Sequence, residues 1–263
     1  AMQNALDVGG DVDVTNASDI HASATYVNAT GIYATTIGDI AITNSGDITG
    51  SSEYGLAFGI RAIAAYLYGF GYATGAVTVN NSGDISLETP YAGFGRAVGI
   101  DAYRAYGEVS VTNSGNIDIY AGGRSYGINA GVKYGDVAVN NSGDITMLSH
   151  TDAQTGIQAS SGNFFVGGGD VSVVNSGDIS VDAWRAYGIR AQAGNGDVEV
   201  SNEGSIYATY GASGGTAFGI LGISGNGDVT VDSSGSITTA VTGQSVGIFG
   251  LAYAGDVNVS NSG

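Results

Sequence analysis

The sequence contains no cysteine and a single proline in 263 residues. Without cysteine, the chain forms no disulfide and offers no thiolate to a metal or to a catalytic mechanism. Cations are also scarce: seven lysines and arginines stand against 24 aspartates and glutamates, which gives a formal net charge of −17. Because nucleic acids and anionic membrane surfaces select basic patches, this balance predicts that neither is a partner.

Long apolar runs are lacking as well, since no segment reaches the roughly 18 apolar residues that a membrane helix needs. We therefore expect a protein that is not embedded in a membrane. Residues 1–9 have neither the basic start nor the apolar centre of a secretory signal, so an exported form would already have lost its signal. The chain is nevertheless 43% hydrophobic and only 12% charged, which is too apolar for disorder. Its 46 glycines therefore indicate turns in a packed, repetitive structure.

One pattern, Gly-Asp-Val-x-Val-x-Asn-Ser-Gly-Asp-Ile, recurs along most of the chain. A second pattern, usually Ala-x-Gly-Ile-x-Ala, falls once in each interval between two copies of the first. Self-similarity of this kind is typical of solenoids. The first pattern begins near residues Gly10, Gly38, Gly75, Gly107, Gly135, Gly169, Gly196, Gly227 and Gly255.

Within each repeat, apolar and polar residues alternate with a period of two, as in Val12 to Thr15, and no segment has helical spacing. Three short strands per repeat predict an all-β fold, a right-handed parallel β-helix (β-solenoid) of about eight to nine coils of about 28 to 37 residues. We expect one solenoid domain over residues 10–263, preceded by a segment, residues 1–9, that could serve as an inter-subunit strand. Stacking at about 4.8 Å would place every residue over its counterpart in the next coil.

The runs Ile-Thr-Asn-Ser-Gly-Asp-Ile at residues 42–48 and Val-Val-Asn-Ser-Gly-Asp-Ile at residues 173–179, together with the Ala-x-Gly-Ile pattern, carry a family resemblance. The sequence resembles the coils of autotransporter passenger domains and of related filamentous-haemagglutinin-like β-helix adhesins of Gram-negative bacteria. The resemblance covers residues 10–263. It implies a β-helix on the cell surface, and it leaves adhesion, aggregation and scaffolding open as activities.

A row of aspartates occurs near the start of the repeats. Like charges about 4.8 Å apart repel each other by roughly 3 to 4 kcal/mol at an effective dielectric constant of about 20, so such a row needs a compensating partner. Calcium is the one candidate cofactor, because it could bridge adjacent carboxylates and turn carbonyls. The alternative is that each carboxylate bonds a neighbouring turn amide and stays hydrated. The candidate calcium ligands are Asp11, Asp39, Asp136, Asp170, Asp197, Asp228 and Asp256.

The asparagine of the Asn-Ser-Gly turn is also repeated, and the alternation places it inside the coil. We expect a structural ladder of stacked amides rather than a ligand site. The ladder residues are Asn16, Asn44, Asn81, Asn113, Asn141, Asn175 and Asn202.

Aromatic residues gather in the arcs of variable length. On a rigid scaffold they could bind glycans or pack against another filament, and the alternative is that they fold over the coil and cover its core. The contact candidates in the two longest insertions are Tyr66, Tyr68, Phe70, Tyr72, Phe164 and Phe165.

Catalysis usually needs an acid, a base and a cation that converge in one groove. The two histidines, His21 and His150, belong to different coils, and Arg61 aligns with Asp101 of the next coil as a surface ion pair. No catalytic constellation recurs in stacking register, so we expect the protein not to be an enzyme.

A solenoid normally needs caps at its ends, and the sequence contains no recognisable cap. We therefore predict an extracellular structural protein, a subunit of a surface filament or sheath that forms a homopolymer by stacking head to tail. The alternative is the stalk or binding region of an autotransporter-type adhesin, which would recognise cell-surface glycans or other cells through its loop aromatics.

Overall fold

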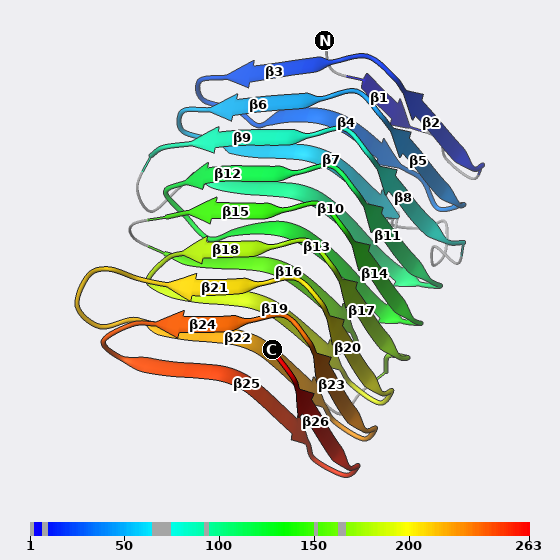
Figure 1. The fold of residues 1–263 in the computed structure, drawn as a ribbon. Helices are drawn as coiled ribbons and strands as arrows, with labels where there is room; N and C mark the ends of the chain where they lie inside the picture. Colours follow the sequence, from blue (N-terminus) through cyan, green and yellow to red (C-terminus); the bar gives the residue numbers. More distant parts are fainter. Residues whose placement is uncertain (1–2, 7–9, 65–74, 92–94, 150–151, 163–166) are drawn as a thin grey trace.

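The structure is a computed structural model that describes residues 3–6, 10–64, 75–91, 95–149, 152–162 and 167–263. These residues form strands and turns and contain no helix, so no helical membrane span occurs among them. The strands stack along one axis in three parallel sheets, with the N-terminus and the C-terminus at opposite ends of the stack (Figure 1). The predicted all-β solenoid with three strands per coil is confirmed.

Sheet A carries the Gly-Ile pattern and has nine strands within the described residues. They are β1 (Gln3–Leu6), β4 (Ala29–Thr35), β7 (Leu56–Ala64), β10 (Arg96–Tyr106), β13 (Ser125–Tyr134), β16 (Ala153–Ser161), β19 (Arg185–Ala193), β22 (Thr216–Ser224) and β25 (Gln244–Ala252).

Sheet B carries the Val-x-Val pattern and likewise has nine strands in the described part of the chain. They are β2 (Val12–Asn16), β5 (Ile40–Asn44), β8 (Val77–Asn81), β11 (Val109–Asn113), β14 (Val137–Asn141), β17 (Val171–Asn175), β20 (Val198–Asn202), β23 (Val229–Ser233) and β26 (Val257–Asn261).

Sheet C follows the Asn-Ser-Gly turn, and eight of its strands are described. They are β3 (Ile20–Ala24), β6 (Ile48–Ser52), β9 (Ile85–Thr89), β12 (Ile117–Ala121), β15 (Ile145–Leu148), β18 (Ile179–Asp182), β21 (Ile206–Thr209) and β24 (Ile237–Ala240).

The repeats stack in register, because each strand pairs in parallel with the strand three places further along the chain. Ile100 pairs with Ile128 in sheet A, Val109 with Val137 in sheet B and Ile117 with Ile145 in sheet C. The side chains of these six residues are at most 1% exposed. Identical branched side chains therefore lie above one another, and they form continuous apolar rows in the core.

The glycine of the Gly-Ile pattern leaves room for the isoleucine that begins each strand of sheet C. A Cβ atom at Gly127 would lie 2.6 Å from the carbonyl oxygen of Gly156 and 2.7 Å from Cγ2 of Ile145. These distances are too short for real contacts, so only glycine fits where sheets A and C meet.

The C-terminal end of the stack exposes apolar side chains. Val257 and Val259 of β26 are 44% and 49% exposed, whereas the valines that pair with them, Val229 and Val231, are 0% and 1% exposed. Sheets A and B continue here to β25 and β26, while sheet C stops at β24. The described end is therefore an open edge of two strands with an apolar inner face.

Candidate functional site

The turn asparagines form one continuous ladder inside the solenoid. Nδ2 of each asparagine from Asn16 to Asn175 donates to Oδ1 of the next, at 2.7 to 2.8 Å. The same nitrogen donates to a carbonyl oxygen two residues along its own turn, as from Asn113 to Gly115 at 2.7 Å. The ladder ends where Asn202 donates to Oγ of Ser233 at 3.2 Å. Each amide thus holds its own turn and fixes the position of the next coil.

The predicted calcium ligands lie on the surface, each beside the equivalent residue of the next coil. Oδ1 of Asp170 accepts a hydrogen bond from the backbone amide of Asp197 at 2.9 Å, and Oδ1 of Asp197 accepts one from Asp228 at 2.8 Å. The same bond joins Asp11 to Asp39, Asp39 to Ala76, Asp136 to Asp170 and Asp228 to Asp256. These bonds offset part of the repulsion within the row.

A second acidic row, at the start of sheet C, is arranged in the same way. Oδ1 of Asp84 accepts the amide of Asn116 at 2.8 Å, and Oδ1 of Asp144 accepts the amide of Asp178 at 2.9 Å. Within the described ranges, no three acidic or histidine side chains converge on a point where a metal ion could be held. Calcium binding stays a prediction, and it would have to use the carboxylate oxygens that face solvent.

Substitutions at Asp170 distinguish a hydrogen-bonding ladder from a calcium ladder. In chelator we expect Asp170→Asn to leave the midpoint of thermal unfolding unchanged or slightly higher, because asparagine keeps the Oδ1 acceptor and removes one like charge. Asp170→Ala loses the bond to Asp197 and should cost about 1 kcal/mol. If Asp170→Asn destabilised the chain as much as Asp170→Ala in chelator, the charge itself would be required. A loss confined to calcium-containing buffer would identify Asp170 as a calcium ligand.

The charges are distributed unevenly among the three sheets. Six of the seven cations lie in strands of sheet A, which contain one acidic residue in the described part of the chain, Asp101. The seventh cation, Arg124, directly precedes β13. Apart from Arg104, whose side chain is buried, these residues make the outer face of sheet A cationic on an otherwise acidic molecule. The six cations are Arg61, Arg96, Arg104, Lys133, Arg185 and Arg190.

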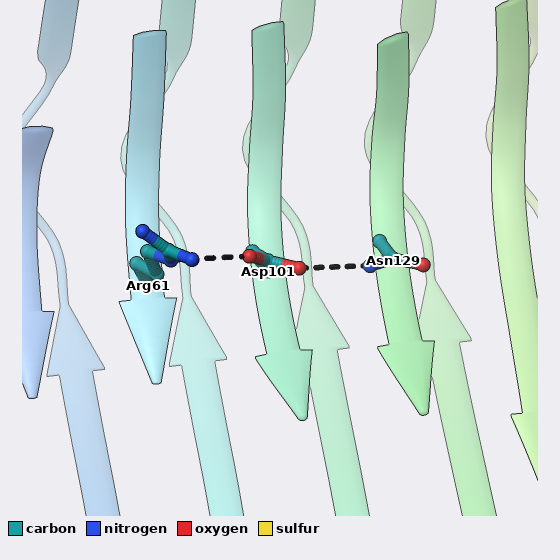
Figure 2. A network of polar contacts seen from close by, with 3 residues as sticks. All are labelled: Arg61, Asp101 and Asn129. Atoms are coloured by element: carbon teal, nitrogen blue, oxygen red, sulfur yellow. Dashed lines mark hydrogen bonds and ion pairs between the residues drawn. The ribbon is translucent and has the colours of Figure 1, made fainter. Parts of the chain in front are cut away.

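The ion pair expected between Arg61 and Asp101 belongs to a row of polar side chains on this face. Nε of Arg61 lies 3.3 Å from Oδ2 of Asp101, and Oδ1 of Asp101 accepts a hydrogen bond from Nδ2 of Asn129 at 2.8 Å. Figure 2 shows the three side chains in line across β7, β10 and β13. Asp101 is only 6% exposed, so the pair is partly buried and not the surface pair that the sequence predicted. The Arg61 guanidinium also covers the ring of Phe58, 4.3 Å from its centroid.

The row continues across β16 and β19, because Asn129 pairs in register with Gln158 and Gln158 pairs with Arg190. Here the outer face is hollowed into a groove of about 360 Å³. Sequence analysis did not identify this site. The sequence feature that could have revealed it is the residue directly after each Gly-Ile pair, when this position is compared from one repeat to the next. Six polar residues of the lining are Tyr126, Asn129, Gln158, Ser160, Arg190 and Gln192.

Arg104 differs from the other cations because its side chain is fully buried. Nε of Arg104 donates to the carbonyl oxygen of Tyr106, and NH2 lies 3.2 Å from the carbonyl oxygen of Gly38. Burial lowers the pKa of the guanidinium below its usual value, and the charge of Asp39 offsets only part of this shift. Arg104 therefore braces a corner between coils and is not available to a ligand.

Surface aromatics pair between neighbouring coils. Tyr26 stacks on Tyr54 with the ring centroids 5.3 Å apart, and Tyr54 contacts Tyr91 at 4.8 Å. All three rings are more than 40% exposed. The six contact candidates in the long insertions, Tyr66, Tyr68, Phe70, Tyr72, Phe164 and Phe165, lie outside the described residues.

Comparison with known proteins found no family model, no curated protein and no solved structure that matches this chain.

Proposed function

We propose that the protein is a structural solenoid of an extracellular filament or sheath, and that its copies stack end to end. The observation that carries the proposal is that every coil stacks in register on the next, and that the first strand of sheet B, β2, has the same pattern as the last described one, β26. This strand pairs with β23 on one side, and the backbone groups on its other side point away from the stack. Free strand edges of this kind are templates for pairing with another chain.

The first strands of a second copy match this edge in sequence and in order. β2 reads Val-Asp-Val-Thr-Asn and β26 reads Val-Asn-Val-Ser-Asn, so β2 of the next copy could pair with β26 as β26 pairs with β23. Val12 and Val14 would then cover Val257 and Val259. Asp256 would accept the amide of Asp11 in the next copy, as Asp228 accepts the amide of Asp256.

Such a contact is heterologous and does not close, so it generates an open filament. Sheet C has one described strand fewer than sheets A and B, and the contact is made through sheets A and B. The repeat patterns that resemble autotransporter passengers and haemagglutinin-like adhesins support an exported protein on a bacterial surface, which is part of the same proposal.

Substitution of Val259 tests the end contact. Val259→Asp would place a carboxylate between two coils, where burial of an unpaired charge is unfavourable. We expect the wild-type chain to form larger species as its concentration rises, and Val259→Asp to remain monomeric, in sedimentation velocity experiments. Val174→Asp is the matched control: Val174 is 43% exposed in the middle of sheet B, away from both ends, and this variant should assemble as the wild type does.

Two results would overturn end-to-end stacking. One is a wild-type chain that stays monomeric at high concentration. The other is a Val259→Asp variant that assembles as well as Val174→Asp, which would locate the contact elsewhere on the molecule.

A further inference from the structure

The groove on sheet A is built from neighbouring strands of the stack. Asn129, Gln158 and Arg190 lie side by side on β13, β16 and β19. Ser160 and Gln192, two residues further along β16 and β19, form a second row beside the first. Because all three strands belong to one continuous sheet, these side chains are presented on a rigid surface.

The polar side chains that line the groove are not equally paired. Gln158 is 8% exposed and lies in the lining of the groove. Nε of Arg190 is buried and without a hydrogen-bond partner in the described chain. By contrast, Asn129 already donates to Asp101. Buried polar groups are normally paired, so an unpaired guanidinium nitrogen beside a hollow indicates a ligand that completes it.

The charge and chemistry of the lining restrict what that ligand is. The residues that line the groove include one cation, Arg190, and no carboxylate, on a chain with 24 acidic residues. An anionic group is therefore favoured. The remaining polar groups include amides and two serine hydroxyls, which both donate and accept hydrogen bonds, as sugar hydroxyls do. The ring of Tyr126 provides an apolar surface for one face of a sugar.

We propose that this groove binds a carboxylated sugar unit of an acidic polysaccharide. Arg190 pairs with the carboxylate, Gln158 and Gln192 bond the ring hydroxyls, and Tyr126 packs against the sugar ring. The guanidinium of Arg190 lies 5.8 Å from the ring centroid of Tyr187, and this contact holds it over the sheet. The site does not depend on end-to-end stacking, because it lies on the outer face of β13, β16 and β19 in the middle of the solenoid.

Titration calorimetry with defined glycans tests the proposal. The probes are polygalacturonate fragments and dextran fragments of similar length, added to the full chain at about physiological ionic strength, where weak surface attraction is screened. We expect the chain to bind polygalacturonate and not dextran. Arg190→Gln should lower the affinity about tenfold or more, because it removes the charged partner of the carboxylate. Gln158→Leu keeps the size of the side chain, removes its hydrogen bonds, and should lower the affinity severalfold.

Lys133→Gln is the matched control, because it removes one positive charge from β13 at an exposed position outside the lining. It should change the affinity less than twofold. Circular dichroism of each variant verifies that the solenoid is folded, and Gln158→Leu, which leaves the net charge unchanged, gives a second reading if Arg190→Gln does not fold.

Three outcomes would overturn the proposal. The first is that polygalacturonate fails to bind or binds no better than dextran. Lys133→Gln could weaken binding as much as Arg190→Gln does, which would show unspecific attraction to the cationic face. Finally, Arg190→Gln could abolish self-association while no glycan binds, which would assign the groove to a contact with the acidic surface of a second copy.

Discussion

Replacing Gly127 by alanine is expected to destabilise the solenoid strongly, while the same substitution at Gly247 is tolerated. The new Cβ at position 127 would meet the Gly156 carbonyl oxygen at 2.6 Å and Ile145 at 2.7 Å. The first of these atoms belongs to the backbone of the next coil, so relief requires the coils to separate. Overpacking of this kind costs about 1 to 3 kcal/mol, and more where the backbone must move. Thermal or denaturant unfolding measures the loss.

Gly247 is the matched control because it occupies the same position of the Gly-Ile pattern in the last described coil. A Cβ there meets only Cγ2 of Ile237, at 3.9 Å. The variants should be compared at a concentration at which the chain is monomeric, since stacking of a second copy would cover Gly247. Equal losses at the two positions would contradict the packing of coil on coil that the structure describes.

Asn141→Ala is expected to have the second large effect, because it interrupts the asparagine ladder in the middle of the stack. Asn141 is fully buried, donates to Gly143 at 2.7 Å and to Asn175 at 2.8 Å, and accepts from Asn113 at 2.8 Å. Each buried group left without a partner costs about 1 to 3 kcal/mol. We therefore expect a loss of at least about 3 kcal/mol in the free energy of unfolding, measured by denaturant titration.

Asn16→Ala provides the comparison at the first rung of the ladder. Asn16 is half-buried, and its bonds to Ser18 and Asn44 lie near solvent, where water can replace them. The expected loss is about 1 kcal/mol. If the two variants lost the same amount, the stabilisation would come from the turn that each asparagine closes and not from the ladder between coils.

The fold could be predicted from the sequence because each stacked row of core side chains consists of the same kind of residue in successive repeats. Valine or isoleucine occupies the position of Val109 in each repeat, and isoleucine occupies the positions of Ile117 and Ile100. Residues at the same place in the repeat must stack when the coils are in register. The regular alternation also placed Asn113 inside the coil. Local pattern, turn chemistry and core packing all favoured the same structure, which is the condition under which a sequence specifies a fold most clearly.

The groove was harder to find because its residues do not repeat. Asn129, Gln158 and Arg190 are three different residue types, and they belong together only when the column is read across coils. The burial of Asp101 was also hard to predict from the sequence, because it depends on the side chains of the coils on both sides. A search for recurring motifs identifies the residues that repeat because the coils stack. It misses a site whose residues differ from one repeat to the next.

The acidic rows show how a repeat can tolerate like charges at short spacing. Each Asp carboxylate accepts a backbone amide of the next coil through one oxygen and leaves the other in water, as at Asp197 and Asp228. The structure therefore supports the alternative in which each carboxylate bonds a neighbouring turn amide. The Asp170 substitutions test whether calcium binding adds to the stability that these bonds provide.

Electron microscopy of the purified chain, in calcium and in chelator, tests the central claim most directly. Nine strands in sheet A at a spacing of about 4.8 Å give a subunit length of about 40 Å. End-to-end stacking predicts long rods with an axial repeat near that length, and it predicts that Val259→Asp gives short particles under the same conditions. Single short particles of the wild-type chain at every concentration, with and without calcium, would contradict the account.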